Sequence, residues 1–518
     1  MSYNILLEDI IRDLGGCGRF QWITAIIVQV SKSIASWSML AMTFNGQEPD
    51  FMCSKGDMGN SSVNQSVFDN VCHAVNQTDN CDGYIFDDDM STVVNEWNLV
   101  CDSKWIVAMI TTIQMSGVLV GCFISGHLGD MIGRKPTFFL SLIILILFNI
   151  IAYFSINWQM YAAIRFIIGM GIGFFLTVQY NVMTEFTPTR WRAIIIAVPA
   201  WAMEAGIFAL ACWGLKDWKN IHLATAAIGL PFLLTTCFVQ ESSRWLLTKR
   251  KYDDAENVIK RIASINGKPA PNISKVIEEA KEHENETKTQ YSVIDLFKTR
   301  HTIKLTLGLS FIWMTISYSY YGLTFGIQSL SGDLYLNMFL MNIIECPASF
   351  SIMYIVNKFG RKYCCILFIM FTGICGIVVG VIQYVDTPHQ GLITNIFAFA
   401  SKMGIAVGWG CLIVYSTEIF PTVVRTTAYG LCNTSARIGG MVAPQIVFLN
   451  DKIPGLMYFL SAALMIISSV IFFTFPDTKD KVLEDTLESF NNNIKPTTEH
   501  NTEMVHCDND GNEKTNQA

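Results

Sequence analysis

The sequence predicts an all-α membrane protein with twelve transmembrane helices arranged as two related six-helix halves. Of its 518 residues, 51% are apolar and only 15% are charged, whereas soluble domains average about 25% charged residues. Long apolar runs alternate with short charged connectors. A run of about 20 apolar residues spans the hydrocarbon core as a helix, a state that pairs every backbone polar group within lipid. Motifs near the ends of these runs occur twice, in the same order.

Twelve runs fit a membrane-spanning helix. The first shows no evident cleavage site of a signal peptide, so it is interpreted as a retained helix. An even number of spans places both termini on the same side. The predicted spans are Phe20–Thr43, Trp105–Ser125, Pro136–Ser155, Gln159–Tyr180, Arg192–Leu215, Ile221–Val239, Ile303–Ile327, Leu334–Asn357, Tyr363–Tyr384, Leu392–Tyr415, Val424–Val447 and Pro454–Phe475.

Lysine and arginine predict which side is cytoplasmic, because cytoplasmic connectors carry an excess of both. The connectors on the side of the termini are rich in them and include Arg134, Lys135, Arg190, Arg192, Lys358, Arg361, Lys362 and Arg425. The opposite connectors hold only Lys55, Lys104, Lys216, Lys219 and Lys452. We therefore expect both termini to be cytoplasmic, in a multi-pass protein of the plasma membrane.

This topology divides the chain into a few parts. Two soluble segments lie outside the spans on the predicted cytoplasmic side: a polar connector with an amphipathic helix over Asp253–Ser264, and a tail whose Asn-, Thr- and acid-rich composition predicts disorder. The parts are an N-terminus (1–19), a first half (20–239), the connector (240–302), a second half (303–475) and the tail (476–518).

The loop 44–104 between the first two spans is predicted to be extracellular and folded. It holds four cysteines, which in an oxidising compartment predict two disulfides with three possible pairings: Cys53, Cys72, Cys81 and Cys101. It also holds three glycosylation sequons, at Asn60, Asn64 and Asn76. We interpret the loop as a stabilised cap, with direct substrate recognition as the alternative.

Three pairs of motifs, each repeated at nearly the same separation, indicate that the halves arose by duplication. Such parallel halves are related by a pseudo-two-fold axis along the membrane normal, with the substrate site between them near the midplane. The pairs are Gly126-x3-Asp130-x2-Gly133-Arg134-Lys135 with Asn357-x2-Gly360-Arg361-Lys362, Glu185-x2-Pro188-Thr189-x2-Arg192 with Glu418-x2-Pro421-Thr422-x2-Arg425, and Gln240-Glu241-Ser242 with Pro476-Asp477-Thr478.

The charged residues of these motifs form a predicted cytoplasmic gate. Ion pairs at helix ends that form in one state of the transport cycle and break in the other suit that role. The alternative is that the charges only anchor loops at the membrane surface. The gate residues are Asp130, Arg134, Glu185, Arg192, Arg361, Glu418 and Arg425.

The motifs resemble those of a known superfamily. Gly126–Lys135 resembles the signature loop of the major facilitator superfamily, and Arg165-Phe166-x2-Gly169-x-Gly171-x-Gly173 resembles its fourth-helix motif. More narrowly, residues 1 to about 490 resemble the organic cation, organic anion and carnitine transporters of solute carrier family 22. The stretches that carry this resemblance are Gly18-Arg19-Phe20-Gln21, Ser91–Cys101, Glu241-Ser242-x-Arg244-Trp245-Leu246, Tyr320-Tyr321-Gly322-Leu323 and Glu418–Arg425. The chain departs from the family pattern at Gln240, Ser243, Met353 and Asn357.

Ionisable residues inside the spans mark the predicted substrate site, because a charge at mid-membrane costs about 2.5–3.5 kcal/mol. Arg437 shares a polar stripe with Tyr429 and Asn433 in span eleven. Its guanidinium suits a carboxylate, and the position resembles the Arg of the anion and carnitine members, where cation members carry an acid. Glu345 stands beside Pro347 in span eight and suits a cationic group. Pro347 is expected to open the helix locally and expose a carbonyl to substrate or water. The alternative is that Arg437 pairs with Glu345 or Glu204 to hold the halves together.

Other side chains complete the predicted site. Tyr320 and Tyr321 lie on a span-seven stripe with Trp313, Ser317 and Thr324, where aromatic faces could hold an ammonium group. Lys32 in span one either lines the cavity or pairs with an acid. Trp201 and Glu204 lie in span five, where the family usually has a small residue at the second position; Glu204 could neutralise Lys32 or Arg437, couple to protons or select cations. For Lys402 in span ten we expect a structural ion pair.

Acids and bases facing one cavity predict a dipolar substrate. We expect transport of a zwitterion such as carnitine, with an organic anion exchanger, an organic cation uniporter or a non-transporting receptor as alternatives. The chain lacks a phosphate-binding loop and any His/Cys metal spacing, so neither an ATP-driven pump nor an enzyme is expected. We expect no cofactor, no metal and no nucleic-acid partner. A sodium or proton coupling ion, and the oligomeric state, stay open.

Overall fold

The structure, a computed structural model, describes residues 3–54, 72, 83–188, 191, 192, 195, 198–235, 238–282, 293–385, 388–421 and 424–478. Twelve spans occur in this part, of which the eighth consists of two helices. The spans are α2 (Arg19–Asn45), α4 (Trp105–Ile132), α5 (Arg134–Tyr153), α6 (Trp158–Thr184), α8 (Ala200–Leu215), α9 (Trp218–Leu234), α13 (Arg300–Phe325), α14 (Leu334–Ile343) with α15 (Glu345–Phe359), α16 (Arg361–Ile382), α17 (Gln390–Ile419), α18 (Arg425–Asn450) and α19 (Leu456–Phe473).

Seven of the described helices are long and apolar enough by themselves to cross a membrane: α2, α4, α5, α6, α16, α17 and α19. The other spans are shorter, divided or more polar. Large apolar side chains are exposed on the outer faces of the helices, including Phe123, Leu147, Leu210, Leu367 and Val470. Such a surface is covered by lipid in a membrane protein, since water would disfavour so much exposed apolar area.

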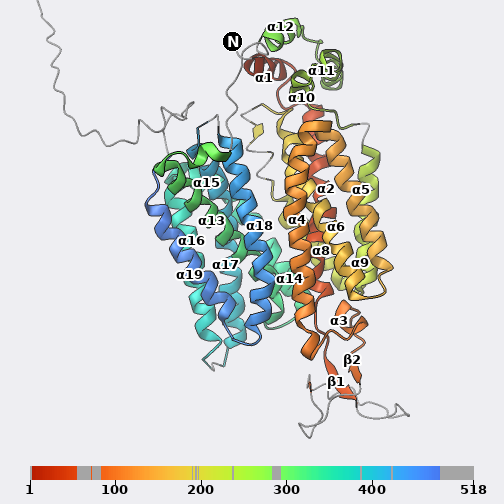
Figure 1. The fold of residues 1–518 in the computed structure, drawn as a ribbon, viewed down its shortest axis with the longest axis vertical. Helices are drawn as coiled ribbons and strands as arrows, with labels where there is room; N and C mark the ends of the chain where they lie inside the picture. The colour runs from red at the N-terminus through yellow and green to blue at the C-terminus, as the bar shows by residue number, and fades with distance from the viewer. Residues whose placement is uncertain are drawn as a thin grey trace, which may run out of the picture.

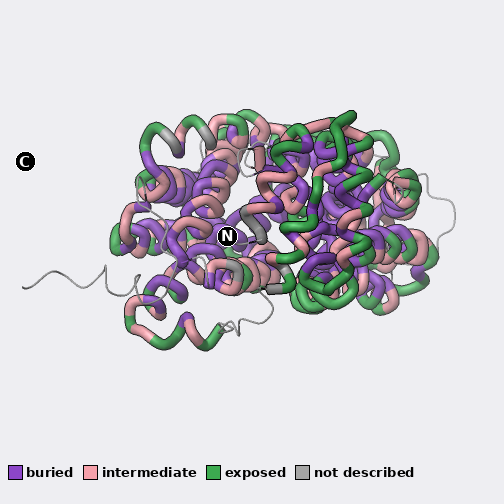
Figure 2. Tube along the Cα trace, turned by 90° about the horizontal axis from the view of Figure 1, so that it is seen from above, coloured by how far each residue is buried: buried purple, intermediate pink, exposed green. Residues whose placement is uncertain are grey.

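The helices form two bundles that lie side by side, one from α2 to α9 and the other from α13 to α19 (Figure 1). Seen along the helices, buried residues occupy the interiors and exposed residues the outer perimeter (Figure 2). One end of the molecule carries the segment between the halves, and we call it the connector end. The opposite end carries a β-hairpin, β1 (Phe51–Ser54) with β2 (Gly83–Phe86), and we call it the hairpin end (Figure 1).

Glycines let the central helices of each half approach closely. A Cβ at Gly169 of α6 would collide with the Gln114 carbonyl of α4, and one at Gly173 would collide with the Val118 carbonyl. In the second half, a Cβ at Gly439 of α18 would likewise collide with the Met314 carbonyl of α13. Small residues at a helix interface allow this backbone contact, which adds dispersion energy where lipid supplies no hydrophobic driving force.

The predicted fifth and eighth spans are interrupted in the structure. The fifth was expected to run as one helix from Arg192; Trp191, Arg192 and Ile195 are helical, but Val198 and Pro199 are not, and α8 begins at Ala200. Proline lacks an N–H and disfavours helical backbone in the residue before it. The eighth was expected to be one span that Pro347 opens locally, and the structure places this opening at Ile344, between α14 and α15. Pro347 lies four residues after Ile343, whose carbonyl therefore has no helical N–H partner.

A small module at the connector end packs around its own apolar core. It consists of α1 (Tyr3–Asp13), α10 (Ser243–Thr248), α11 (Tyr252–Asn266) and α12 (Ser274–Glu282). Helix α11 contains the predicted amphipathic helix, whereas α1 lies in the N-terminus, for which no helix was predicted. The Asn266 side chain ties the module to the first span, because it accepts from the Phe20 N–H at 2.9 Å and donates to the Leu14 carbonyl at 2.9 Å. The core residues include Leu7, Ile11, Trp245, Ile259 and Ile273.

The described part of the predicted outer loop is folded. It contains the hairpin, the short helices α3 (Val93–Glu96) and η1 (Cys101–Ser103), and a disulfide between Cys72 and Cys101. This bond selects one of the three possible pairings, which leaves Cys53 and Cys81 as candidates for the second predicted disulfide. Cys81 and the three sequons Asn60, Asn64 and Asn76 lie outside the described residues.

Candidate functional site

A buried ion pair lies where α15 and α17 meet. Lys402 Nζ lies 3.2 Å from Glu345 Oε1, and the two side chains are 0% and 10% exposed. The same ammonium donates to Thr324 Oγ1 at 2.7 Å and lies 3.2 Å from the centre of the Tyr320 ring. Since a buried charge is tolerated only when it is paired, each member requires the other. The acid predicted to receive a substrate cation therefore already has a cation of the protein beside it.

The break in the eighth span explains how Glu345 reaches this position. Glu345 is the first residue of α15 and directly follows the break at Ile344. The Ser349 hydroxyl donates to the Glu345 carbonyl at 2.9 Å. A proline-induced break inside a span is tolerated where side chains or water satisfy the released backbone groups.

Arg437 lies on α18 without a carboxylate partner among the described residues. Its Nη2 donates to Asn433 Oδ1 at 3.3 Å, one turn away on the same helix. The guanidinium also contacts the Tyr321 hydroxyl and, across the interface between the halves, the Cys122 thiol of α4. Its Nε has no hydrogen-bond partner. The expected alternative, an ion pair of Arg437 with Glu345 or Glu204, is not formed in the described structure.

Aromatic rings surround these charges. The Trp313 ring contacts Trp409 at 5.9 Å and Tyr429 at 5.3 Å between centroids, and Tyr320 contacts Trp409 at 5.9 Å. Trp201 of the first half donates from Nε1 to the Tyr320 hydroxyl at 3.2 Å. Of these residues, Trp409 was not among the predicted site residues. It lies on α17 about two turns after Lys402, and no periodic signal in the sequence separates it from packing residues.

The other two predicted ionisable residues form no ion pair with Arg437, Glu345 or Lys402 in the described structure. Lys32 of α2 is 3% exposed, and its ammonium lies 5.0 Å from the centre of the Tyr180 ring. Glu204 of α8 is half-buried, and its backbone carbonyl accepts from Trp37 Nε1 at 3.0 Å. In the described structure neither side chain has a partner of opposite charge, so the neutralisation of Lys32 by Glu204, one of the alternative roles given above for Glu204, is not seen.

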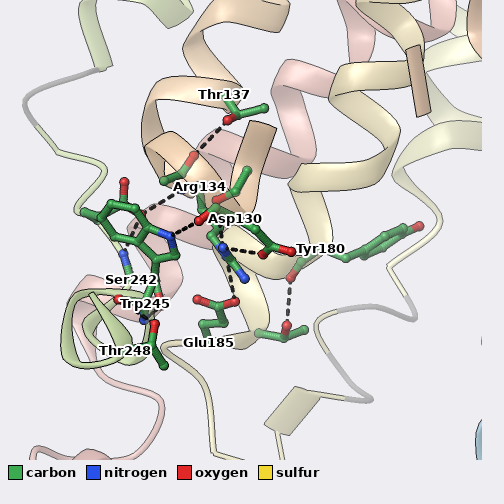
Figure 3. A network of polar contacts seen from close by, with 12 residues as sticks. Asp130, Arg134, Thr137, Tyr180, Glu185, Ser242, Trp245 and Thr248 are labelled. Atoms are coloured by element: carbon green, nitrogen blue, oxygen red, sulfur yellow. Dashed lines mark hydrogen bonds and ion pairs between the residues drawn. The ribbon is translucent and has the colours of Figure 1, made fainter. Parts of the chain in front are cut away.

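Three of the four predicted gate residues of the first half form a network at the connector end (Figure 3). Arg134 pairs with Asp130 at 2.9 Å and with Glu185 at 3.3 Å. Glu241, from the motif after span six, accepts from the Arg134 N–H at 2.9 Å. It thereby places a carboxylate at the N-terminus of α5, where the helix dipole favours negative charge. Burial raises the pKa of the Glu241 carboxyl, although bonds from Ser242, Arg134 and Lys135 oppose that shift.

Gly133 is required at the turn before α5 for two reasons. Its φ of +113° lies in a region that side chains disfavour, and a Cβ there would collide with Glu241. Its counterpart Gly360, before α16, has φ +87°. The repeated glycine of the motif therefore marks the same sharp turn in both halves.

The second half repeats the network with fewer members. Arg361 lies 3.0 Å from Glu418 Oε2, and the Thr478 hydroxyl donates to the same oxygen at 2.9 Å. Arg192 and Arg425 do not pair with Glu185 and Glu418 here. Arg192 instead donates to the Thr187 carbonyl at 2.8 Å and lies 3.8 Å from Glu8, and Arg425 donates to the Phe420 carbonyl at 3.3 Å. Each of these pairs lies within one half or between that half and the connector module.

The structure thus brings together Arg437, Asn433, Tyr320, Tyr321, Glu345 and Trp201 of the predicted substrate site. It adds Lys402, Trp409 and Cys122, none of which was predicted to contact the substrate. Among the described residues, no group of three His, Cys, Asp or Glu side chains is placed to hold a metal ion. Chemically, the cluster can bind an organic ion through one guanidinium, several hydroxyls and aromatic faces.

Comparison with known sequences identifies relatives over most of the chain. The family described as "Sugar (and other) transporter" matches residues 57–490. Solute carrier family 22 member 4 of Mus musculus is 32% identical over 79% of this chain and 74% of the relative. Organic cation/carnitine transporter 2 of Mus musculus is 31% identical over 79% of this chain and 73% of the relative. Solute carrier family 22 member 6-A of Xenopus laevis is 28% identical over 96% and 95%.

Comparison with solved structures agrees on the fold. The inward open conformation of the xylose transporter XylE from E. coli covers 90% of this chain and 99% of its own, with a TM-score of 0.65 and 16% identity. XylE bound to 6-bromo-6-deoxy-D-glucose gives a TM-score of 0.64 at 15% identity. At this level of identity the likeness concerns the fold alone: two six-helix halves of the major facilitator type.

Proposed function

The chain belongs to solute carrier family 22 within the major facilitator superfamily, and we propose that the organic ion it carries is a zwitterion such as carnitine. Transport of organic ions across a membrane, rather than enzymatic chemistry, is the activity common to this family. The choice of substrate rests on the charges of the site and is the part that needs an experiment.

One observation carries the proposal: Arg437 has no carboxylate partner in the described structure, whereas Glu345 is paired with Lys402. The pair is close to neutral as a unit, so the charge left over in the cluster is positive. A planar guanidinium with an unbonded Nε is suited to receive a carboxylate. A substrate that carries a carboxylate would supply the missing partner.

The aromatic residues support the second half of the proposal. An ammonium group on the substrate needs no carboxylate when it can lie against ring faces, each of which contributes about 0.5–2 kcal/mol. Lys402 over the Tyr320 ring is an example of such a contact within the protein itself. Trp313, Trp409 and Tyr429 supply further rings on the same side of the cluster. A compact zwitterion would combine both kinds of contact.

We further propose an orientation and a mode of transport. The connector end is cytoplasmic and the hairpin end extracellular, because lysine and arginine concentrate at the former and a disulfide lies at the latter. The halves then expose the central site to each side of the plasma membrane in turn, with the networks around Arg134 and Arg361 acting at the cytoplasmic helix ends.

The test is a charge reversal at Arg437. We expect Arg437→Asp to abolish uptake of labelled carnitine in cells, because the substrate carboxylate would face an acid. Arg437→Lys should keep part of the uptake with a higher KM, since a point charge replaces the guanidinium fork. Uptake is measured with a panel of organic anions and organic cations as competitors, with and without a sodium gradient.

A matched control separates this effect from a general effect of charge. Arg300→Asp makes the same change at an exposed position at the start of α13 and should leave uptake unchanged. Undiminished uptake of carnitine and organic anions by Arg437→Asp would contradict the proposal. Inhibition by organic anions alone would favour the organic anion exchanger, and uptake of cations alone would favour the cation uniporter.

A further inference from the structure

At the hairpin end, one lysine joins the two halves of the molecule. Lys104, which precedes α4 in the first half, lies 2.7 Å from Glu48 of the same half and 2.9 Å from Asp451 of the second half. Its side chain is 37% exposed, and those of Glu48 and Asp451 are 26% and 48% exposed. We name this group the Lys104 clasp.

Local helix energetics do not explain these charges. Lys104 is the N-cap of α4, and Asp451 is the C-cap of α18. The helix dipole disfavours a cation at the first position and an anion at the second. Each charge therefore lies at a helix end whose dipole destabilises it. The oppositely charged partner in the other half offsets that destabilisation.

The interface around the clasp contains a pocket and few polar contacts between the halves. Gln328 of the second half donates to the Gly46 carbonyl at 3.3 Å, and Gln445 of α18 donates to Thr112 of α4 at 3.0 Å. Between the halves, directly beside the clasp, lies a pocket with mainly apolar walls that include Val107, Phe325, Val447, Phe448 and Met457. Exposed ion pairs and single hydrogen bonds are weak. Beyond the clasp, the halves are also joined at this end by a packed apolar core that includes Phe44, Phe208 and Met338. The clasp is therefore the charged, partly exposed part of a larger interface.

We infer that the Lys104 clasp is the latch of the extracellular gate, which holds the halves together in the present conformation and must break for the site to open at the hairpin end. The inference rests on the proposed alternating exposure, though not on the proposed substrate. The pocket beside the clasp then lies on the path from the hairpin end toward Arg437, because Cys122, which contacts Arg437, follows Lys104 and Thr112 along α4.

Cys122 provides a native reporter for this gate. A membrane-impermeant maleimide is applied without substrate to intact cells and, in parallel, to inside-out vesicles, and a Cys122→Ser variant identifies the signal of this thiol. We expect Lys104→Met and Asp451→Asn each to raise the rate of Cys122 modification from the hairpin side by about two- to fivefold. The exchange Lys104→Asp with Asp451→Lys, made together with Glu48→Gln so that the new acid at position 104 meets no second acid, should return the rate toward that of the unmodified protein.

The matched control is Lys219→Met. Lys219 lies 2.7 Å from Glu96 at the same end of the molecule, but both residues belong to the first half. Its loss should leave Cys122 modification unchanged. Unchanged rates in both Lys104→Met and Asp451→Asn, or an equal rise in Lys219→Met, would overturn the inference. A wrong orientation would instead exchange the results from cells and vesicles, and a wrong substrate would leave them unaffected.

Discussion

Single residues decide the charge of the substrate site. Glu345 and Lys402 come from different helices, and their pairing leaves Arg437 as the cation of the cluster that has no acid beside it. Two buried charges cost desolvation energy that their attraction offsets only while both are present. The pair is therefore sensitive to loss of one partner and tolerant of loss of both.

We predict that Glu345→Gln destabilises the protein by about 3–5 kcal/mol, because Lys402 would remain buried without a counter-charge. The double variant Glu345→Leu with Lys402→Met should recover most of that stability. The measurement is the midpoint of thermal unfolding of the purified protein in detergent.

An exposed pair serves as the control for this experiment. Glu256 and Lys260 lie 2.8 Å apart on α11 with side chains 42% and 54% exposed, so Glu256→Gln should cost less than about 0.5 kcal/mol. Equal destabilisation by the two single variants would contradict the buried-pair account.

At the scale of elements, contact between helix backbones holds each half together. The contact between α4 and α6 depends on glycines whose missing side chains admit the carbonyls of the other helix. The same arrangement recurs between α13 and α18 through Gly439. Because lipid is as apolar as the helix surfaces, this fit contributes more than hydrophobicity does to the choice of helix partner.

We predict that Gly169→Ala lowers the stability of the first half by about 1–3 kcal/mol, because its Cβ must displace the Gln114 backbone. Gly214→Ala in α8 is the matched variant, since a Cβ there meets nothing within 4 Å. It should be neutral or stabilise by about 0.5–1 kcal/mol, as expected for Gly to Ala in a helix. Thermal unfolding of both variants in detergent provides the comparison. Similar midpoints would show that the close contact contributes little.

At the scale of the whole molecule, the two ends differ in what they join. At the connector end, the networks around Arg134 and Arg361 each lie within one half, and the α10–α12 module is attached to the first half through Trp245 and Asn266. At the hairpin end, the Lys104 clasp and the Gln445–Thr112 bond cross between the halves. This distribution suits halves that pivot about a contact at one end.

We predict that the hairpin end faces the cell exterior. Glycans at Asn60, Asn64 and Asn76 should then be removed by an endoglycosidase, which would increase the electrophoretic mobility of the protein. The triple variant Asn60→Gln, Asn64→Gln, Asn76→Gln should migrate like the enzyme-treated protein. An antibody to a tag on the N-terminus should bind only permeabilised cells, and binding to intact cells would contradict the proposed orientation.

Much of the architecture could be predicted from the sequence. Apolar runs identify the spans, and the motif pairs around Arg134 and Arg361 identify two related halves. The features that were missed leave no mark in hydropathy or in the spacing of apolar residues. The α1 helix is short and is stabilised by contact with the connector. The local opening of span eight, by contrast, was predicted from Pro347, and the structure places it at Ile344. Trp409 was missed because the sequence pattern around a tryptophan inside a span is the same whether its ring packs against other helices or faces a binding site.

The sequence by itself determined the membrane class, the duplicated halves and the set of charges inside the spans. These follow from hydropathy and spacing, which are properties of the chain alone. Only the tertiary structure decided which charges neutralise one another. Lys402 with Glu345, and Lys104 with Asp451, join helices far apart in sequence, and an ion pair depends on a distance of a few ångströms that no linear pattern encodes.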